Sequence, residues 1–221
     1  MTTAAPAAAT AIFDLDGTLT WHDTLVPYLL GFVARRPARW LSVVSVLAAL
    51  MVFAVGKSSR DRCKERIIAA CLAGASQAEL TRHTERFVAN LLRRGMRARA
   101  LEVLEAHRAS GARLVLLSAS PDLYVNAIAT RLGFHECLCT ELLWNAQRLV
   151  GTFVSANRRA AEKARLVSAL RDRRSGSMAA YANSSSDLHH LELVDHPVLV
   201  NGSARARRLA AARGIACEQW R

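Results

Sequence analysis

Lysine is scarce in this chain of 221 residues, although basic residues are not. Lysine and arginine number 30 against 18 acids, for a formal net charge of +12, yet lysine occurs only at Lys57, Lys64 and Lys163. The arginines are scattered and no recognition motif accompanies them, which argues against nucleic-acid binding. Two interpretations stay open: an arginine-rich composition without functional meaning, or attraction to anionic lipid headgroups and phosphorylated substrates.

The five cysteines form no CxxC pair. Cys137 and Cys139 lie two positions apart in a strand-like run, so they point to one face and are not expected to bridge each other. Reduced thiols are typical of cytoplasmic proteins. The first ten residues, MTTAAPAAAT, also lack the basic and apolar regions of a secretory signal. We therefore expect a cytoplasmic protein.

The pattern of apolar residues predicts an α/β fold with an insertion. An apolar strand is predicted at 11–15, and helical patterns follow from 23 to 108. Beyond residue 112, short apolar strands alternate with helices, which is typical of βαβ units around a parallel sheet. The prediction is a Rossmann-like parallel sheet core, residues 1–22 and 95–221. An all-helical cap, residues 23–94, is inserted between the first strand and the rest.

One segment of the predicted cap, residues 40–56, holds no charged residue. Basic residues flank it on both sides, namely Arg35, Arg36, Arg39, Lys57 and Arg60. At ~1.5 Å rise per residue, a helix of this length just reaches the lower limit for spanning a bilayer. Two hypotheses stay open: a helix buried inside the cap, or peripheral contact with an anionic membrane by shallow insertion. The second would associate the protein with the inner face of the cell membrane.

The stretch FDLDGTLT places Asp14 and Asp16 directly after the first predicted strand. Ligands of open α/β sheets bind at the carboxyl ends of strands. A carboxylate there can attack phosphorus to form an aspartyl-phosphate, and a second can protonate the leaving alkoxide and then deprotonate water. Gly17 and Thr18 allow a sharp turn and offer N–H groups to phosphate oxygens. The alternative is an acidic turn that closes a strand.

Later positions supply what else phosphoryl transfer needs: donors for the phosphoryl oxygens, a nearby cation and a divalent metal. Ser118 ends a predicted strand, where its hydroxyl and the N–H of Ala119 can hold phosphate. Lys163 lies at the start of a predicted helix. Asn183 and Asp187 follow another predicted strand and offer oxygen ligands to a metal.

In these motifs the chain resembles the haloacid dehalogenase superfamily of phosphohydrolases, and within it the phosphoserine-phosphatase-like branch, subfamily IB. The resemblance covers nearly the whole chain: DLDGT at 14–18, then Ser118, Lys163 and ANSSSD at 182–187. It implies a phosphatase in which Asp14 is the nucleophile and Asp16 the general acid/base.

The same resemblance implies the remaining roles. Ser118 and Lys163 bind the phosphoryl group, while Asp14, the Asp16 carbonyl, Asn183 and Asp187 surround Mg²⁺. The usual fourth motif is GDxxxD, and this chain departs from it with Ala182 and Asn183. An Asn carbonyl can still ligate Mg²⁺, but the missing charge is expected to weaken metal affinity. A non-catalytic phosphate-binding module is the corresponding alternative.

The predicted cap should select the substrate. Its sequence resembles the caps of subfamily members that hydrolyse phosphatidylglycerophosphate, so a lipid phosphate is one predicted substrate class. A small soluble phosphomonoester such as phosphoserine is the other. Asp23 matches an acidic position that faces the substrate in related enzymes. Arg60, Arg62 and Lys64 are cap cations that could meet a substrate anion.

Overall fold

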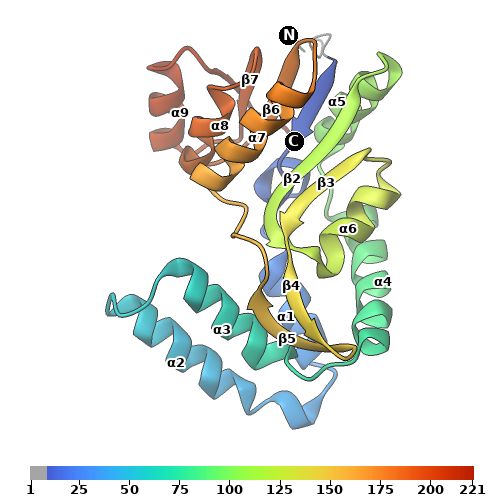
Figure 1. The fold of residues 1–221 in the computed structure, drawn as a ribbon, viewed down its shortest axis with the longest axis vertical. Helices are drawn as coiled ribbons and strands as arrows, with labels where there is room; N and C mark the ends of the chain where they lie inside the picture. The colour runs from blue at the N-terminus through green and yellow to red at the C-terminus, as the bar shows by residue number, and fades with distance from the viewer. Residues whose placement is uncertain (1–8) are drawn as a thin grey trace.

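The computed structural model describes residues 9–221. They form a parallel sheet with helices on both faces and a cap beyond the carboxyl ends of the strands (Figure 1). The sheet has the strand order β3-β2-β1-β6-β7-β8. Its strands are β1 (Thr10–Phe13), β2 (Arg113–Pro121), β3 (Glu136–Thr140), β6 (Met178–Ala182), β7 (His196–Val200) and β8 (Ala216–Glu218). Ile12 of β1 pairs with Val115 on one side and Ala180 on the other. The chain therefore builds outward in both directions from β1, and the predicted α/β sheet is confirmed.

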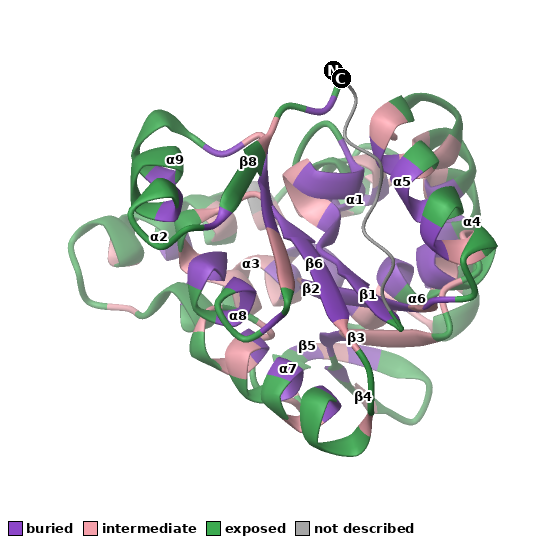
Figure 2. Cartoon of the chain, turned by 90° about the horizontal axis from the view of Figure 1, so that it is seen from above, coloured by how far each residue is buried: buried purple, intermediate pink, exposed green. Residues whose placement is uncertain are grey.

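Alternate residues along each strand face opposite layers, because side chains of a strand point to opposite sides. Ala11 and Phe13 join the hydrophobic cluster under α5 (Ala98–Ala109) and α6 (Asp122–Arg131). Ile12 joins a separate cluster on the other face. Three helices cover that second face, namely α7 (Ala161–Arg173), α8 (Leu188–Leu191) and α9 (Ala204–Ala211). The central strands β1, β2 and β6 are accordingly buried along most of their length, whereas the edge strand β8 is largely exposed (Figure 2).

The inserted segment contributes α1 (Leu25–Val33), α2 (Ser42–Ala54), α3 (Arg60–Leu72) and α4 (Gln77–Arg94), and a short turn of helix at Pro37–Arg39 precedes α2. A capping box begins α4: Ser76 and Glu79 each accept a hydrogen bond from the other's backbone N–H. Tyr28 of α1 and Ile68 of α3 belong to the same cluster as the α5–α6 face of the sheet. The cap is thus packed onto the core at its base.

A two-stranded hairpin also lies with the cap helices, formed by β4 (Leu142–Asn145) and β5 (Arg148–Phe153). A tight turn joins the two strands, with positive φ angles of 42° at Ala146 and 63° at Gln147. On β5, Gly151 approaches α3 so closely that a Cβ there would lie 2.7 Å from Cα of Ala69. The hairpin therefore extends a predominantly helical cap with two strands from later in the chain.

Helix α2 lies on the outside of the cap. Only 6% of the apolar window Pro37–Ala54 is buried, and its mean hydropathy is 1.8. Leu41, Val44 and Met51 are 81%, 67% and 70% exposed. By length and composition this window could cross a membrane. Of the two hypotheses for this segment, burial within the cap is therefore wrong for the chain as described here.

Candidate active site

The site lies where β1, β2 and β6 end beside one another. Asp14 follows β1, Ser118 lies near the end of β2, and Asn183 follows β6. In a parallel sheet these carboxyl ends share an edge, and the chain turns outward in both directions from β1, so a crevice opens there. Around this edge a cavity of about 470 Å³ extends up to the cap. The predicted residues Asp14, Asp16, Ala119, Lys163, Asn183 and Asp187 line it.

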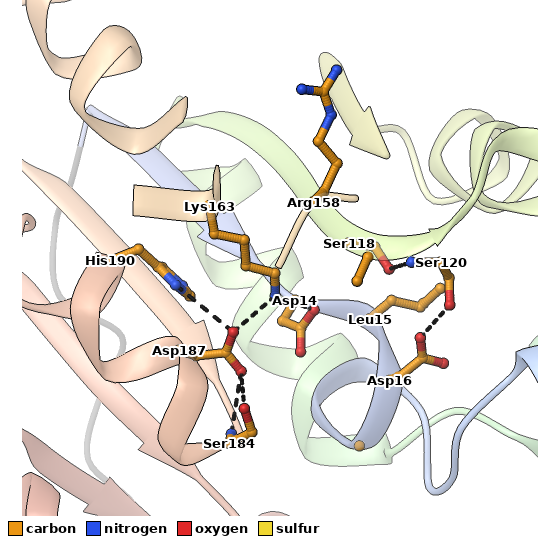
Figure 3. Close-up of polar contacts among 12 residues, drawn as sticks. Asp14, Leu15, Asp16, Ser118, Ser120, Arg158, Lys163, Ser184, Asp187 and His190 are labelled. Carbon is orange, nitrogen blue, oxygen red and sulfur yellow. Dashed lines mark hydrogen bonds and ion pairs between the residues drawn. The ribbon is translucent and has the colours of Figure 1, made fainter. Parts of the chain in front are cut away.

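Asp14 is buried at 7% exposure and is held by Lys163, which lies in the first turn of α7. Nζ of Lys163 donates to Oδ1 of Asp14 at 2.7 Å and lies 3.2 Å from Oδ1 of Asp187 (Figure 3). Burial raises the pKa of Asp14 to about 7, with Lys163 opposing the rise and the charge of Asp187 adding to it. Two buried carboxyl groups thus share one ammonium.

Charge interactions outweigh burial for the other two members of this group, Lys163 and Asp187. Burial alone would lower the pKa of Lys163, but Asp14 and Asp187 outweigh it and the pKa is raised. Burial alone would raise the pKa of Asp187, but Lys163 and then His190 outweigh it and the pKa is lowered. The lowered pKa favours the ionised form of Asp187, which its predicted role as a metal ligand requires.

Asp16 is held by donors that the sequence did not indicate. Its Oδ1 accepts from the N–H and hydroxyl of Thr24 at 2.7 and 2.6 Å, and its Oδ2 accepts from the hydroxyl of Ser120 at 2.6 Å. The hydroxyl of Tyr124 lies 3.1 Å from that of Thr24 and supports it. Burial and then Asp23 raise the pKa of Asp16 against these hydrogen bonds. A carboxyl fixed in place with a raised pKa suits a group that gives and takes a proton.

Gly17 permits the turn that directly follows the two acids. Its φ is +76°, and a Cβ there would lie 2.0 Å from Nδ2 of Asn183. This turn falls within the distorted helical segment Leu15–Leu19. Left-handed backbone and close approach both call for glycine, and together they place Asn183 against the Asp16–Gly17 turn.

Two predicted phosphate ligands, Thr18 and Ser118, are less accessible from the cavity than the other predicted residues. Thr18 and Ser118 are fully buried and are not among the described residues that line the cavity. Oγ of Ser118 accepts from the N–H of Ser120 at 3.0 Å and keeps its own proton to donate. Oγ1 of Thr18 is buried without a hydrogen-bond partner among residues 9–221. Ala119 and Lys163, by contrast, face the cavity.

The predicted metal ligands fit a hard cation. Asp14, Asn183 and Asp187 line the same cavity and offer carboxylate and amide oxygens, the ligand type that Mg²⁺ prefers. Oδ2 of Asp187 accepts from the N–H and hydroxyl of Ser184 at 3.3 and 2.7 Å, which fixes the carboxylate. Within residues 9–221, no group of three or more His, Cys, Asp and Glu side chains could hold a metal. The set therefore depends on Asn183 and on backbone oxygen.

The cap side of the cavity is mainly apolar. Its aliphatic and aromatic lining comes from α1, α2 and α3, with Leu25, Val26, Leu29, Leu50, Phe53 and Ile67. Asp23, Arg60 and Lys64 line it as predicted, and Arg159 adds a cation that the sequence did not indicate. The carboxylate of Asp23 also accepts from the N–H of Leu25 at 2.9 Å, as expected of an acid at a helix start.

Comparison with known proteins agrees with this geometry. The family model for haloacid dehalogenase-like hydrolases matches residues 11–192, so the chain belongs to that family. Some of the relatives that the chain resembles are named as phosphatases. Protein CicA of Caulobacter vibrioides is 30% identical over 184 residues, covering 83% of this chain and 82% of that protein. Phosphoserine phosphatase SerB1 of Mycobacterium tuberculosis is 28% identical over 219 residues, covering 96% and 71%.

Solved structures share the fold. A protein of unknown function from Bordetella pertussis Tohama I superposes with a TM-score of 0.79 at 24% identity, covering 94% of this chain and 96% of that one. A substrate-bound phosphoserine phosphatase superposes with a TM-score of 0.67 at 12% identity, covering 98% and 93%. These likenesses establish the architecture of sheet and cap.

Proposed function

We propose that the chain is a Mg²⁺-dependent phosphomonoester phosphatase that works through a phosphorylated Asp14. The observation that carries the proposal is the arrangement of Asp14, Asp16 and Lys163 around one cavity at the carboxyl edge of the sheet. A nucleophile, a proton donor and a cation are the parts that phosphoryl transfer requires.

In the first half of the reaction, a carboxylate oxygen of Asp14 bonds to phosphorus as the bond to the leaving oxygen breaks. Asp16 gives its proton to that leaving oxygen, which departs as an alcohol. Lys163 offsets the charge on the phosphoryl oxygens, and Ser118 and the N–H of Ala119 donate to them.

In the second half, water attacks phosphorus and Asp16 takes back a proton. The bond from phosphorus to Asp14 breaks, so inorganic phosphate leaves and both carboxyl groups are restored. Asp14, Asn183, Asp187 and the carbonyl of Asp16 are the groups that would hold Mg²⁺, which would reduce repulsion between the anions.

The test is Mg²⁺-dependent phosphate release from phosphoserine, small sugar phosphates and phosphatidylglycerophosphate, with Asp14→Asn as the blank. We expect release that the blank loses by about 10⁴-fold or more, as for removal of other catalytic nucleophiles. Equal release by the blank would contradict the proposal. A folded wild type that binds inorganic phosphate but releases none from any substrate would favour the non-catalytic module.

A second candidate, a lipid phosphate taken from an anionic bilayer, is favoured by one observation. Leu50 and Phe53 of the exposed helix α2 also line the active-site cavity. The outer apolar surface of the cap thus continues into the wall of the site. The sequence holds no Asp or Glu between Asp23 and Asp61, while basic residues flank α2. An apolar helix edged by cations matches the interface of an anionic membrane.

Vesicle sedimentation separates this candidate from a soluble phosphatase. We expect the protein to sediment with vesicles that contain phosphatidylglycerol, less so with phosphatidylcholine alone, and Leu47→Gln with Met51→Gln to abolish sedimentation. Leu209→Gln, an exposed apolar residue of α9, is the matched control. Wild-type protein that stays in solution, with phosphoserine the preferred substrate, would reject the lipid candidate.

A further inference from the structure

Lys64, in the cap helix α3, reaches across the cavity to the core. Its Nζ donates to the backbone oxygen of Ala119 at 2.6 Å and lies 3.4 Å from Oδ1 of Asn157. The ring of Phe153 lies beside it, with 5.6 Å between Nζ and the ring centroid. Burial lowers the pKa of this ammonium although Asp16 is nearby. The hydrogen-bond acceptors of Nζ are thus two neutral oxygens, the Ala119 carbonyl and the Asn157 side-chain amide.

The groups that receive Lys64 form a closed network between cap and core. The hydroxyl of Thr140 donates to the same Ala119 oxygen at 2.8 Å and lies 3.2 Å from Oδ1 of Asn157. Nδ2 of Asn157 donates to Oδ1 of Asp61 at 2.6 Å, one turn before Lys64 on α3. Two side chains of α3 thus attach to the end of β2 and to the segment that leads into α7.

The carbonyl that Lys64 holds belongs to the peptide that orients the site. This peptide is planar, so fixing the oxygen of Ala119 also fixes the N–H of Ser120. That N–H donates to Oγ of Ser118 at 3.0 Å, and the hydroxyl of Ser120 donates to Oδ2 of Asp16 at 2.6 Å. One peptide therefore sets the phosphate-binding hydroxyl and one of the hydrogen bonds of the proton donor.

We propose that Lys64 is a positioning residue, which completes the active site by fixing the Ala119–Ser120 peptide when the cap lies on the core. This inference rests on the proposed function, since it assigns Ser118 and Asp16 the roles given there. It differs from the sequence-based prediction that Lys64 meets the substrate anion directly. A ligand of the substrate would act mainly on KM, whereas a positioning residue acts mainly on kcat.

The experiment compares Lys64→Met with Arg66→Met, which removes the same charge from an exposed position of the same helix. Turnover of p-nitrophenyl phosphate is measured at saturating Mg²⁺, together with hydrogen exchange of the segment 117–123. For Lys64→Met we expect kcat to fall by about 10- to 100-fold, the size of effect that small misplacements of reacting groups produce. KM should change less, and the segment should exchange faster, while Arg66→Met leaves both readouts unchanged.

The outcomes separate the two proposals. A raised KM with unchanged kcat and unchanged exchange would overturn the inference and make Lys64 a ligand of the substrate. Faster exchange in Lys64→Met would support the positioning role even if the wild type released no phosphate, which would count against the proposed function alone. If Lys64→Met fails to fold, Asn157→Ala replaces it, with a smaller fall in kcat and faster exchange expected. Unchanged exchange in that variant would overturn the inference.

Discussion

The sheet edge and the cap border the same cavity, but they do so with different side chains. On the sheet side, Asp14 and Lys163 are buried and paired, and Asp16 accepts three hydrogen bonds. On the cap side, α1 and α2 present mostly apolar groups, and Leu50 is still 44% exposed. The charged groups on the sheet side are fixed in position, whereas the apolar side chains of the cap determine the shape and the hydration of the cavity. This difference supports the proposal that the sheet carries out phosphoryl transfer and that the cap selects the leaving group.

The largest effect is expected from breaking the charge pair of the sheet side. Lys163→Met leaves Asp14 and Asp187 buried without their cation, and removal of one partner from a buried pair costs about 3–5 kcal/mol. We expect the free energy of unfolding to fall by that amount in urea titrations, with phosphate release lost as well.

A double variant provides the control for this prediction. Asp14→Asn together with Lys163→Met removes one of the two stranded carboxylates, so part of the lost stability should return. Additive costs in the double variant would mean that Lys163 and Asp14 do not stabilise each other.

The sheet side was also the more predictable of the two walls. Asp14, Ser118 and Asn183 could be assigned to one edge from the sequence, because each follows an apolar run that alternates with helices. The donors to Asp16 could not, since Ser120 lies 104 positions away along the chain and no local pattern records that pairing. Ser120 lies two residues beyond Ser118 in the same strand end, which is the one signal that could have drawn attention to it.

Predictions were weaker for the cap, and the reason is physical. Residues 40–56 hold no charged residue and are mostly apolar, so no clear periodicity indicates which face of the helix is covered. The structure shows that Ala49 is buried against the neighbouring helix while Leu47 and Met51 face outward. The hairpin at 142–153 also joins the cap from a later part of the chain, and only tertiary packing on α3 reveals that.

Shortening one apolar side chain in the sheet and one in the cap should give an effect of intermediate size. Leu116 in β2 is fully buried, and Leu116→Ala should lower the free energy of unfolding by about 2–5 kcal/mol. Leu47 is 55% exposed on α2, and Leu47→Ala should change it by less than about 0.5 kcal/mol. Chemical denaturation of both variants without lipid measures the difference. An equal cost at both positions would mean that α2 is covered in the protein in solution.

The smallest effect concerns a carboxyl of the core that lies outside the catalytic cavity. Burial raises the pKa of Asp122 from 3.8 to about 6, and its Oδ1 is buried without a hydrogen-bond partner among the residues described. The folded state therefore keeps a proton that the unfolded chain has lost, so stability from this group falls as pH rises from about 4 to about 6. Asp122→Asn removes the pH-dependent loss of stability and should therefore stabilise the protein at pH 8. We expect a gain of only about 1 kcal/mol, because partial exposure of this carboxyl to water reduces the effect.

The gain should fade toward pH 4, and thermal unfolding at both pH values measures it. Phosphate release should be unchanged in Asp122→Asn, since this carboxyl is absent from the described lining of the cavity. Asp122 and Asp16 both have raised pKa values and both accept hydrogen bonds, but of the two only Asp16 lines the cavity. If Asp122→Asn loses activity while remaining folded, Asp122 also contributes to the active site, although it lies outside the cavity. Unchanged activity would leave position, and not the raised pKa, as the property that distinguishes the catalytic carboxyl.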